Sequence, residues 1–211
     1  MINFRASLLF LMAISSAGAV LAGAQPKPYV VVGLSKGLAI ELPRNWRVFN
    51  QNQMITLEAA VVARGTTLGE ADFSSDLSFA ANYYDDNGNT AGMVNLRHYP
   101  DQLISEPEVR QFSARDLRIY DDAAKGQISQ SFIGSDLKLI AWIGTSPRPI
   151  NGLTALVSEY RRTSQNGIFR VRLVRILDAA RSFTLTVSYR EDQSTILQPI
   201  TDYVISTLRR R

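Results

Sequence analysis

Cysteine is absent from the 211-residue chain, and histidine occurs once, as His98. Without cysteine the protein has no disulfide, no thiolate metal ligand, no cysteine nucleophile and no cysteine for lipid attachment. A single histidine excludes a histidine pair and a histidine-rich metal site. The stability of the folded chain must therefore come from its hydrophobic core.

The sequence also lacks a strong excess of either charge. Lys and Arg number 23 against 19 Asp and Glu, which gives a formal net charge of +4. This value is far below the basic excess of nucleic-acid-binding domains, so we expect no nucleic-acid partner. It is compatible with weak peripheral contact with an anionic membrane surface. No glycine-rich phosphate loop follows a predicted strand, and we expect no cofactor.

Apart from its first 24 residues, the chain has no long apolar run. Residues 1–24 contain an early positive charge, an uncharged apolar run over Ala6–Leu21 and the small-x-small sequence Ala22-Gly23-Ala24. This pattern is typical of a secretory signal peptide cleaved before Gln25, with an uncleaved membrane anchor as the alternative. We expect residues 25–211 to form a single soluble domain that is periplasmic or secreted, a length sufficient for one hydrophobic core.

Two hairpins are predicted in the first half of this domain. PYVVVG and LAIELP are interpreted as short strands joined by LSKG, because the second alternates apolar and polar residues. SFAANYY and NTAGMVNLRHY flank the pair Asn87-Gly88, which is typical of a type I′ hairpin turn. The segment Gln53–Arg64 fits a buried strand and a short helix equally well, and the sequence does not decide between them.

A long helix and a sheet are predicted in the second half. Ser105, followed by a proline, is typical of a helix N-terminus, and apolar residues at helical spacing continue the helix to about Ala124 or beyond. Leu137–Ile143 is interpreted as the next strand. The C-terminal third, Ile150–Leu208, is a succession of predicted strands closed by a helix. We therefore predict an α+β fold in which a C-terminal helix packs on an antiparallel sheet.

The predicted hairpin around residue 165 collects charged side chains. A two-residue turn at Asn166-Gly167 would place Arg161 opposite Arg172, whereas a four-residue loop would place Arg161 opposite Arg170 and Glu159 opposite Arg172. Either register puts these side chains on one face: Glu159, Arg161, Arg170 and Arg172. Like charges opposite one another are destabilising, and Glu159 offsets only part of the three arginines. The face is either simply solvated or a docking surface for an acidic partner, and the second hypothesis makes it our candidate partner-binding site.

Two further patterns have possible chemical roles. Residues 33–37 match the GxSxG motif of serine hydrolases, with Ser35 as the nucleophile and His98 as the available base. That motif needs a helix after the serine, whereas LAIELP is predicted to be a strand, so a serine hydrolase is an alternative only. Asp85 and Asp86 at a hairpin tip are candidate ligands for a weak divalent-ion site, although the nearby glycine is wrongly spaced for a calcium loop and a plain turn is the default.

Several segments together resemble the PsbP-like family, which includes DcrB-type bacterial envelope proteins. They are GLAIELPRNW early in the domain, then PINGLTALVSEY, FRVRLVRIL, SFTLTVSYRE and a last helix ending in VISTL. The resemblance implies an α/β/α sandwich around a central antiparallel sheet. Members of this fold mostly act by binding, so it implies an exported, non-catalytic accessory protein of the bacterial cell envelope that docks to a protein partner. It carries over no catalytic residue.

A carrier of a small apolar ligand is the alternative role within the same fold. It requires an apolar pocket between the sheet and a helix, and a fully filled core would exclude it. The sequence leaves open the identity of the partner or ligand and the oligomeric state.

Overall fold

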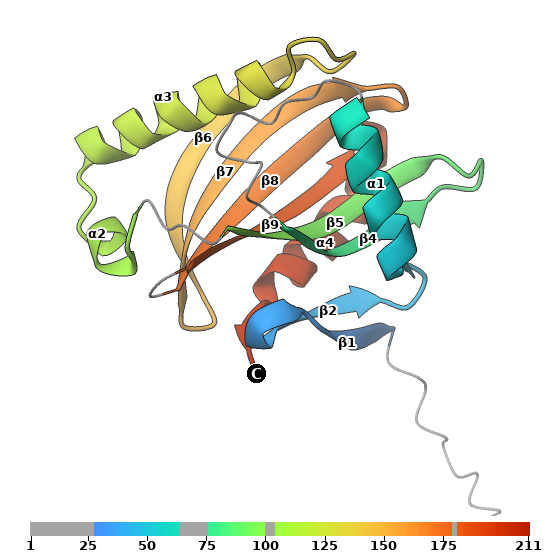
Figure 1. Cartoon of the computed structure of the whole chain (residues 1–211), viewed down its shortest axis with the longest axis horizontal. Helices are drawn as coiled ribbons and strands as arrows, with labels where there is room; N and C mark the ends of the chain where they lie inside the picture. The colour runs from blue at the N-terminus through green and yellow to red at the C-terminus, as the bar shows by residue number, and fades with distance from the viewer. Residues whose placement is uncertain (1–27, 64–75, 100–103, 179–180) are drawn as a thin grey trace, which may run out of the picture.

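The computed structural model describes residues 28–63, 76–99, 104–178 and 181–211 (Figure 1). The predicted signal peptide and its cleavage site lie outside these residues. The described part confirms the α+β prediction, because a large antiparallel sheet is covered by helices on both faces. No helix among the described residues is long and apolar enough to span a bilayer.

The main sheet has seven strands, and each pairs antiparallel with its neighbour. Figure 1 shows that the strands of its C-terminal half arch strongly. In spatial order the strands are β3 (Arg47–Val48), β4 (Asp76–Tyr84), β5 (Thr90–Tyr99), β9 (Arg181–Arg190), β8 (Gly167–Asp178), β7 (Leu153–Ser164) and β6 (Leu139–Ile150).

One face of this sheet holds the main core. It is covered by the C-terminal helix and by a small sheet, and the leucine, isoleucine and valine side chains of both layers pack against it. The C-terminal helix is α4 (Ser194–Ser206), and the short 3₁₀ turn η3 (Glu191–Gln193) precedes it. The small sheet consists of the strands β1 (Tyr29–Gly33), β2 (Leu38–Pro43) and β10 (Arg209–Arg210). The 3₁₀ turn η1 (Ser35–Gly37) connects β1 to β2. The two N-terminal strands and the packed C-terminal helix were predicted correctly.

The opposite face is covered by three helices: α1 (Gln51–Ala63), α2 (Glu106–Arg110) and α3 (Ala114–Ser131). Successive residues of a strand point to opposite faces, and β7 shows the division clearly. Val157 packs in the main core with Val204 of α4, whereas Tyr160 packs in a separate cluster with Ile128 of α3. The layers are therefore helix, sheet and helix.

Capping side chains define where these helices begin. Asn50 and Gln53 exchange side-chain to backbone hydrogen bonds of 3.0 Å at the start of α1. Of the segment Gln53–Arg64, which the sequence left open, the described residues to Ala63 are helical, and Arg64 lies outside them. Ser105 forms the predicted cap of α2. A second capping box, between Ser113 and Asp116, starts α3. The single long helix predicted from the sequence is thus two helices, and the second continues past Ala124 to Ser131.

Two other predictions change in detail. The hairpin between β4 and β5 is present, but only Gly88 has a positive φ, +76°, and the N–H of Gly88 donates to the carbonyl of Asp85. This is a type I turn followed by a left-handed glycine, not a type I′ turn. The strand predicted over Leu137–Ile143 runs on through two prolines to Ile150. Because β6 is an edge strand, its prolines need not donate to a neighbour on the open side.

Candidate functional site

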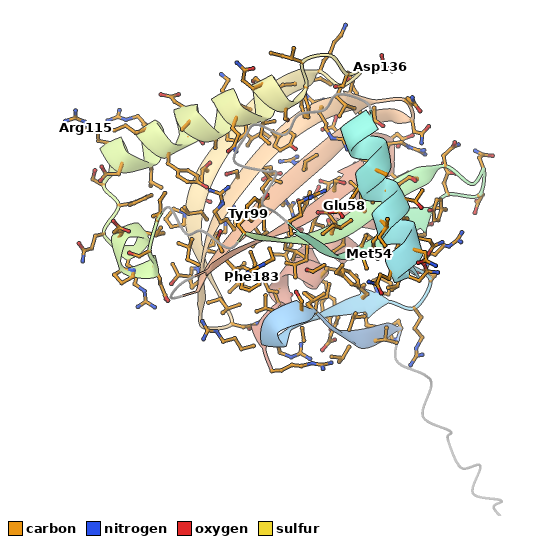
Figure 2. The ribbon with its side chains drawn as sticks, viewed as in Figure 1. Met54, Glu58, Tyr99, Arg115, Asp136 and Phe183 are labelled. Atoms are coloured by element: carbon orange, nitrogen blue, oxygen red, sulfur yellow. The ribbon has the colours of Figure 1, made fainter. Side chains whose placement is uncertain are left out.

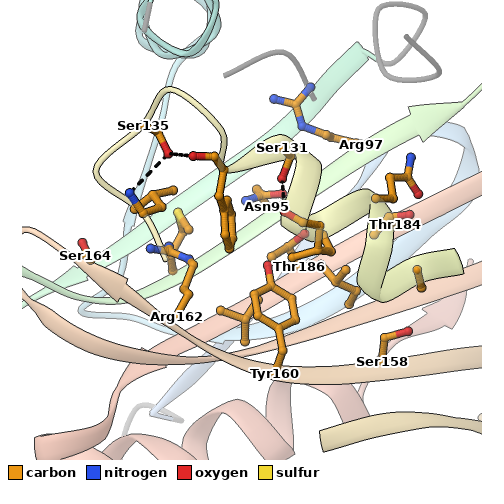
Figure 3. Close-up of a pocket in the computed structure, with 18 of the residues that line it drawn as sticks. Asn95, Arg97, Ser131, Ser135, Ser158, Tyr160, Arg162, Ser164, Thr184 and Thr186 are labelled. Atoms are coloured by element: carbon orange, nitrogen blue, oxygen red, sulfur yellow. Dashed lines mark hydrogen bonds between the residues drawn. The ribbon is translucent and has the colours of Figure 1, made fainter. Parts of the chain in front are cut away.

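A cavity of about 540 Å³ lies between α3 and the sheet face that α3 covers (Figure 3). Its volume falls within the range of sites that bind small molecules. The side chains around it come from β5, β7, β8, β9, α3 and the turn that follows α3. Figure 2 shows Arg115 near the start of α3 and Asp136 in the turn beyond its end, so the helix extends across this face of the sheet.

One wall of the cavity is apolar and aromatic. Tyr160 of β7 stacks on Trp142 of β6, with ring centroids 5.8 Å apart, and Phe132 at the end of α3 lies 6.4 Å from Tyr160. The indole Nε1 of Trp142 donates a 2.8 Å hydrogen bond to Asp121, which ties α3 to the edge strand. Burial raises the pKa of the Tyr160 phenol to about 12. This wall offers apolar surface to a ligand.

The floor of the cavity is polar because of the alternation in β9. Phe183, Leu185 and Val187 point into the main core, so the intervening Thr184 and Thr186 point toward the cavity. The register places Thr184 between Arg175 of β8 and Arg97 of β5, directly opposite both. The same register places Thr186 between Leu173 and Asn95. Hydroxyl, amide and guanidinium groups therefore form adjacent rows across three strands.

Three arginines line the cavity, and they differ in their partners. Arg97 lies 3.6 Å from Glu58 of α1. Arg175 lies over the Tyr120 ring, 5.9 Å from its centroid, and among the described residues it forms no ion pair.

Arg162 has a similar environment at the other end of the cavity. It lies over the Phe169 ring at 5.4 Å and donates a 3.0 Å hydrogen bond to the carbonyl of Thr163. Within the described part of the chain it too lacks an ion pair, and burial lowers its pKa. Buried arginines are normally paired with a carboxylate, and no described carboxylate offsets the charge of Arg162 or Arg175.

Thr184 is a second unsatisfied group. Its side chain is 6% exposed, and its buried hydroxyl has no hydrogen-bond partner among the described residues. A buried hydroxyl without a partner costs about 1–3 kcal/mol, so such groups usually mark a missing water, ion or ligand.

The donor set of the cavity consists mainly of neutral and cationic groups. Among the described residues, its lining contains hydroxyls, amides and arginines but no histidine or lysine, and its one carboxylate, Asp136, is exposed. Such groups can hold a ligand through hydrogen bonds and charge.

The charged hairpin face predicted from the sequence lies on the opposite side of the sheet, with α4. The observed register pairs Arg161 with Arg170 and Glu159 with Arg172, which is the second of the two predicted registers. Arg170 forms an ion pair with Glu159, and Arg172 contacts Glu159 at 3.5 Å.

Two carboxylates from other elements complete the compensation of this face. Arg161 donates two 2.6 Å hydrogen bonds to Glu191, and Arg172 pairs with Asp202 of α4. Three arginines thus meet three carboxylates. These ion pairs hold the hairpin to η3 and α4, so the cluster has a structural role. Docking of a partner at this face stays a prediction.

The alternative in which Ser35 is the nucleophile of a serine hydrolase is wrong. The 3₁₀ turn that contains Ser35 leads directly into strand β2, whereas the GxSxG motif of these enzymes requires a helix after the serine. The Ser35 hydroxyl and the Nε2 atom of His98 are both buried without a hydrogen-bond partner in the described residues, so they are not bonded to each other. His98 instead packs against Phe183, with ring centroids 5.2 Å apart.

Asp85 at the hairpin tip is engaged within the protein. Its carboxylate accepts from the backbone N–H groups of Asn87 and Asn89, at 3.0 and 2.9 Å, and pairs with Arg190 at 2.8 Å. These bonds lower the pKa of Asp85. Asp86 beside it is exposed, and no group of three metal-ligating side chains occurs among the described residues. Weak ion binding by Asp85 and Asp86 stays a prediction.

The cavity residues were missed by sequence reasoning, although one signal was present. In SFTLTVS, Ser182, Thr184, Thr186 and Ser188 occupy alternate positions. Because β9 is a central strand with helices on both faces, a polar stripe along it faces the interior and not solvent. Such a stripe predicts either buried hydrogen bonds or a lined cavity.

Comparisons with known proteins support the fold. No protein-family model matches the sequence, and no curated protein matches it. The structure is similar to the solution structure of cyanobacterial PsbP (CyanoP) from Synechocystis sp. PCC 6803, with a TM-score of 0.51 and 13% identity over 94% of this chain and 99% of that chain. A weaker match is the crystal structure of LpqN, involved in cell envelope biogenesis of Mycobacterium tuberculosis, with a TM-score of 0.45 and 13% identity over 85% of this chain and 88% of that chain. The chain therefore has the PsbP-like fold, as the resemblance in its sequence implied.

Proposed function

We propose that this chain is an exported, non-catalytic binding protein that holds a small, partly apolar molecule in the cavity between α3 and the sheet. The cavity of about 540 Å³ is the observation that supports this function best. Export is the part of the proposal that rests on the signal-peptide pattern of residues 1–24.

The lining supports a ligand with two kinds of surface. Tyr160, Phe132 and Val171 offer apolar contact at one wall, whereas Thr184 and Thr186 offer hydroxyls on the floor. Small-molecule sites typically combine predominantly apolar walls with a few polar groups that fix the orientation of the ligand. A purely apolar ligand, as the sequence-based alternative had it, would leave the floor unsatisfied.

A cavity-filling substitution tests this proposal. Thr186→Phe places a large side chain in the middle of the floor, whereas Thr195→Phe makes the same change at an exposed position of α4. We expect the neutral apolar dye N-phenylnaphthylamine to bind wild type and Thr195→Phe alike, and to bind Thr186→Phe at least about tenfold more weakly, which is a loss of about 1.4 kcal/mol. Thermal melting would verify that both variants fold. Equal dye binding by the two variants would contradict the proposal.

Docking to an envelope protein through the charged hairpin face is a second candidate function. A hollow of about 510 Å³ lies on this face, bordered by Glu159, Arg172 and Asp202. Ile140 and Ile143 of the edge strand are also exposed, at two irregularities of the β6–β7 ladder on either side of the pair Ala141–Arg161. An exposed apolar edge next to hydrogen-bonding groups is a common feature of protein interfaces.

Affinity capture from the native envelope tests the second function. Arg161→Glu reverses one charge of the hairpin face, and Arg115→Glu makes the same change at an exposed site on α3. Loss of a crosslinked partner in Arg161→Glu alone would support docking at this face. Identical capture by both variants would end the hypothesis.

A further inference from the structure

We propose that the cavity binds an anionic amphiphile, whose carboxylate or phosphate lies over the row formed by Arg175, Thr184 and Arg97. This inference rests on the proposed function and specifies the chemical class of its ligand. The apolar part of the ligand extends from that row toward the aromatic wall at Tyr160 and Phe132.

The row is built by the register of three neighbouring strands. Arg175 of β8 lies opposite Thr184 of β9, and Thr184 lies opposite Arg97 of β5. Adjacent strands are about 4.8 Å apart, so the Cα atoms of the two arginines are separated by about 10 Å. Arginine side chains are long enough to converge over that distance on one anion held above the threonine.

The charges of the row favour an anion. Arg175 lies over the Tyr120 ring, and no carboxylate among the described residues pairs with it. Arg97 is paired with Glu58, which offsets its charge, so Arg175 supplies the net positive charge of the row. Charge-assisted hydrogen bonds from guanidinium groups to carboxylates or phosphates are among the strongest in proteins.

The hydroxyl of Thr184 points to the same ligand. It is buried and without a hydrogen-bond partner in the described part of the chain, and an oxyanion that reaches the row would accept a hydrogen bond from it. Thr186 and Asn95 lie one register row further along and add a hydroxyl and an amide. An apolar ligand would leave the Thr184 hydroxyl unsatisfied.

The apolar part of the ligand follows from the next rows of the sheet. Tyr160 and Val171 lie opposite each other, four residues along β8 from Arg175, which is about 13 Å. They pack with Ile128 and Phe132 of the α3 segment in one cluster. Figure 3 shows Tyr160 and Arg162 pointing from β7 into the cavity.

Arg162 is the competing position for the anion. It is a single arginine, already bonded to a carbonyl and stacked on Phe169, and the apolar cluster surrounds it. The row at Thr184 combines two arginines with an unsatisfied hydroxyl. The geometry therefore favours the row, and Arg162→Gln tests the competing position directly.

Calorimetric titration with matched ligands tests the inference. Dodecanoate and dodecyl phosphate carry an anionic group, whereas dodecanol has the same alkyl chain and no charge. We expect wild type to bind at least one anion about tenfold or more tightly than dodecanol. Arg175→Gln should lose roughly 10- to 100-fold in affinity for that anion, because it removes a hydrogen bond to a charged group, with little change for dodecanol. Thr184→Val should cause a smaller loss, of several fold, and Arg115→Gln, at an exposed position of α3 outside the cavity, should behave like wild type.

The outcomes separate this inference from the proposed function. Equal affinity for dodecanol and both anions in wild type would overturn the inference and leave ligand binding intact. Loss of the preference in Arg162→Gln instead of Arg175→Gln would also overturn it. Failure of all three ligands and of the apolar dye to bind wild type would overturn the proposed function itself. Melting temperatures close to that of wild type would verify that each variant is folded.

Discussion

Arginine has two different environments in this protein, and the difference separates structure from site. On the α4 side of the sheet, Arg161, Arg170 and Arg172 each contact a carboxylate. On the α3 side, Arg162 and Arg175 lie over aromatic rings, and neither forms an ion pair with a described residue. Compensated arginines hold elements together, whereas uncompensated ones in a cavity are available to a ligand.

On the α4 side of the sheet, Arg172 is expected to contribute most to stability. Its side chain is 13% exposed and lies between Glu159 and Asp202. Arg172→Glu would place three carboxylates together, so we expect it to lower the free energy of unfolding by about 2 kcal/mol or more in urea denaturation. Arg161→Gln removes a pair in which the arginine is 37% exposed and should cost at most about 1 kcal/mol. Equal losses in the two variants would refute this distinction.

The aromatic wall has a pH signature. Burial raises the pKa of Tyr160 to about 12 in the folded protein, from an ordinary value of 10.0. Between these values the unfolded tyrosine ionises while the folded one stays protonated, so stability is complete below pH 10 and falls as the pH rises toward 12.

Between pH 10 and pH 12, we expect Tyr160 to lower the free energy of unfolding by about 3 kcal/mol. Tyr160→Phe should make the melting temperature fall less steeply above pH 10. Part of the decline should remain, because burial also raises the pKa of Tyr120. An unchanged alkaline slope in Tyr160→Phe would contradict the assignment. The pH dependence of thermal unfolding by circular dichroism would measure it.

At the scale of elements, the helix α3 depends on its own cap. The Ser113 hydroxyl accepts from the N–H of Asp116, and the Asp116 carboxylate accepts from the N–H of Ser113 at 2.9 Å. We expect Ser113→Ala to lower the free energy of unfolding by about 1 kcal/mol. Ser129→Ala in the last turn of the same helix is the control and should cost less, since it caps nothing. A similar cost for both would show that the capping box is not important.

This cap also explains an error in the sequence-based prediction. A helical spacing of apolar residues on both sides of residues 111–113 gave one long helix, although Ser113 and Asp116 have the spacing of a capping box. The strand predicted over Leu137–Ile143 likewise ended too early, before Pro147 and Pro149 of β6. Prolines are tolerated on an edge strand, and only the sheet order shows that β6 lies at the edge.

Other elements were predictable because their signals are local. Alternation predicted β1, β2 and the C-terminal strands, and Ser105 predicted a helix start. The face shared by Glu159, Arg161 and Arg172 followed from period-two geometry alone. Their partners Glu191 and Asp202 could not be predicted in this way, because they come from elements whose packing depends on the whole fold.

At the scale of the whole molecule, the cavity depends on features that no local pattern contains. α3 is anchored over the edge of the sheet by the Trp142–Asp121 hydrogen bond, and α1 reaches the opposite edge through Glu58, which accepts from the N–H of Leu77 at 3.0 Å. The space above β8, β9 and β5 follows from how these two helices are set on an arched sheet (Figure 1). The polar stripe of β9 shows that this space exists, and its neighbours on β5 and β8 show which ligand it suits.

The most direct test of this account is a crystal structure of the protein soaked with terminally brominated dodecanoate. We predict an anomalous bromine peak near Phe132 and Tyr160, with the carboxylate over Thr184 between Arg175 and Arg97. A bromine peak confined to the outer surface, or no peak in the cavity at saturating ligand, would contradict the claim that this protein binds an anionic amphiphile between α3 and the sheet.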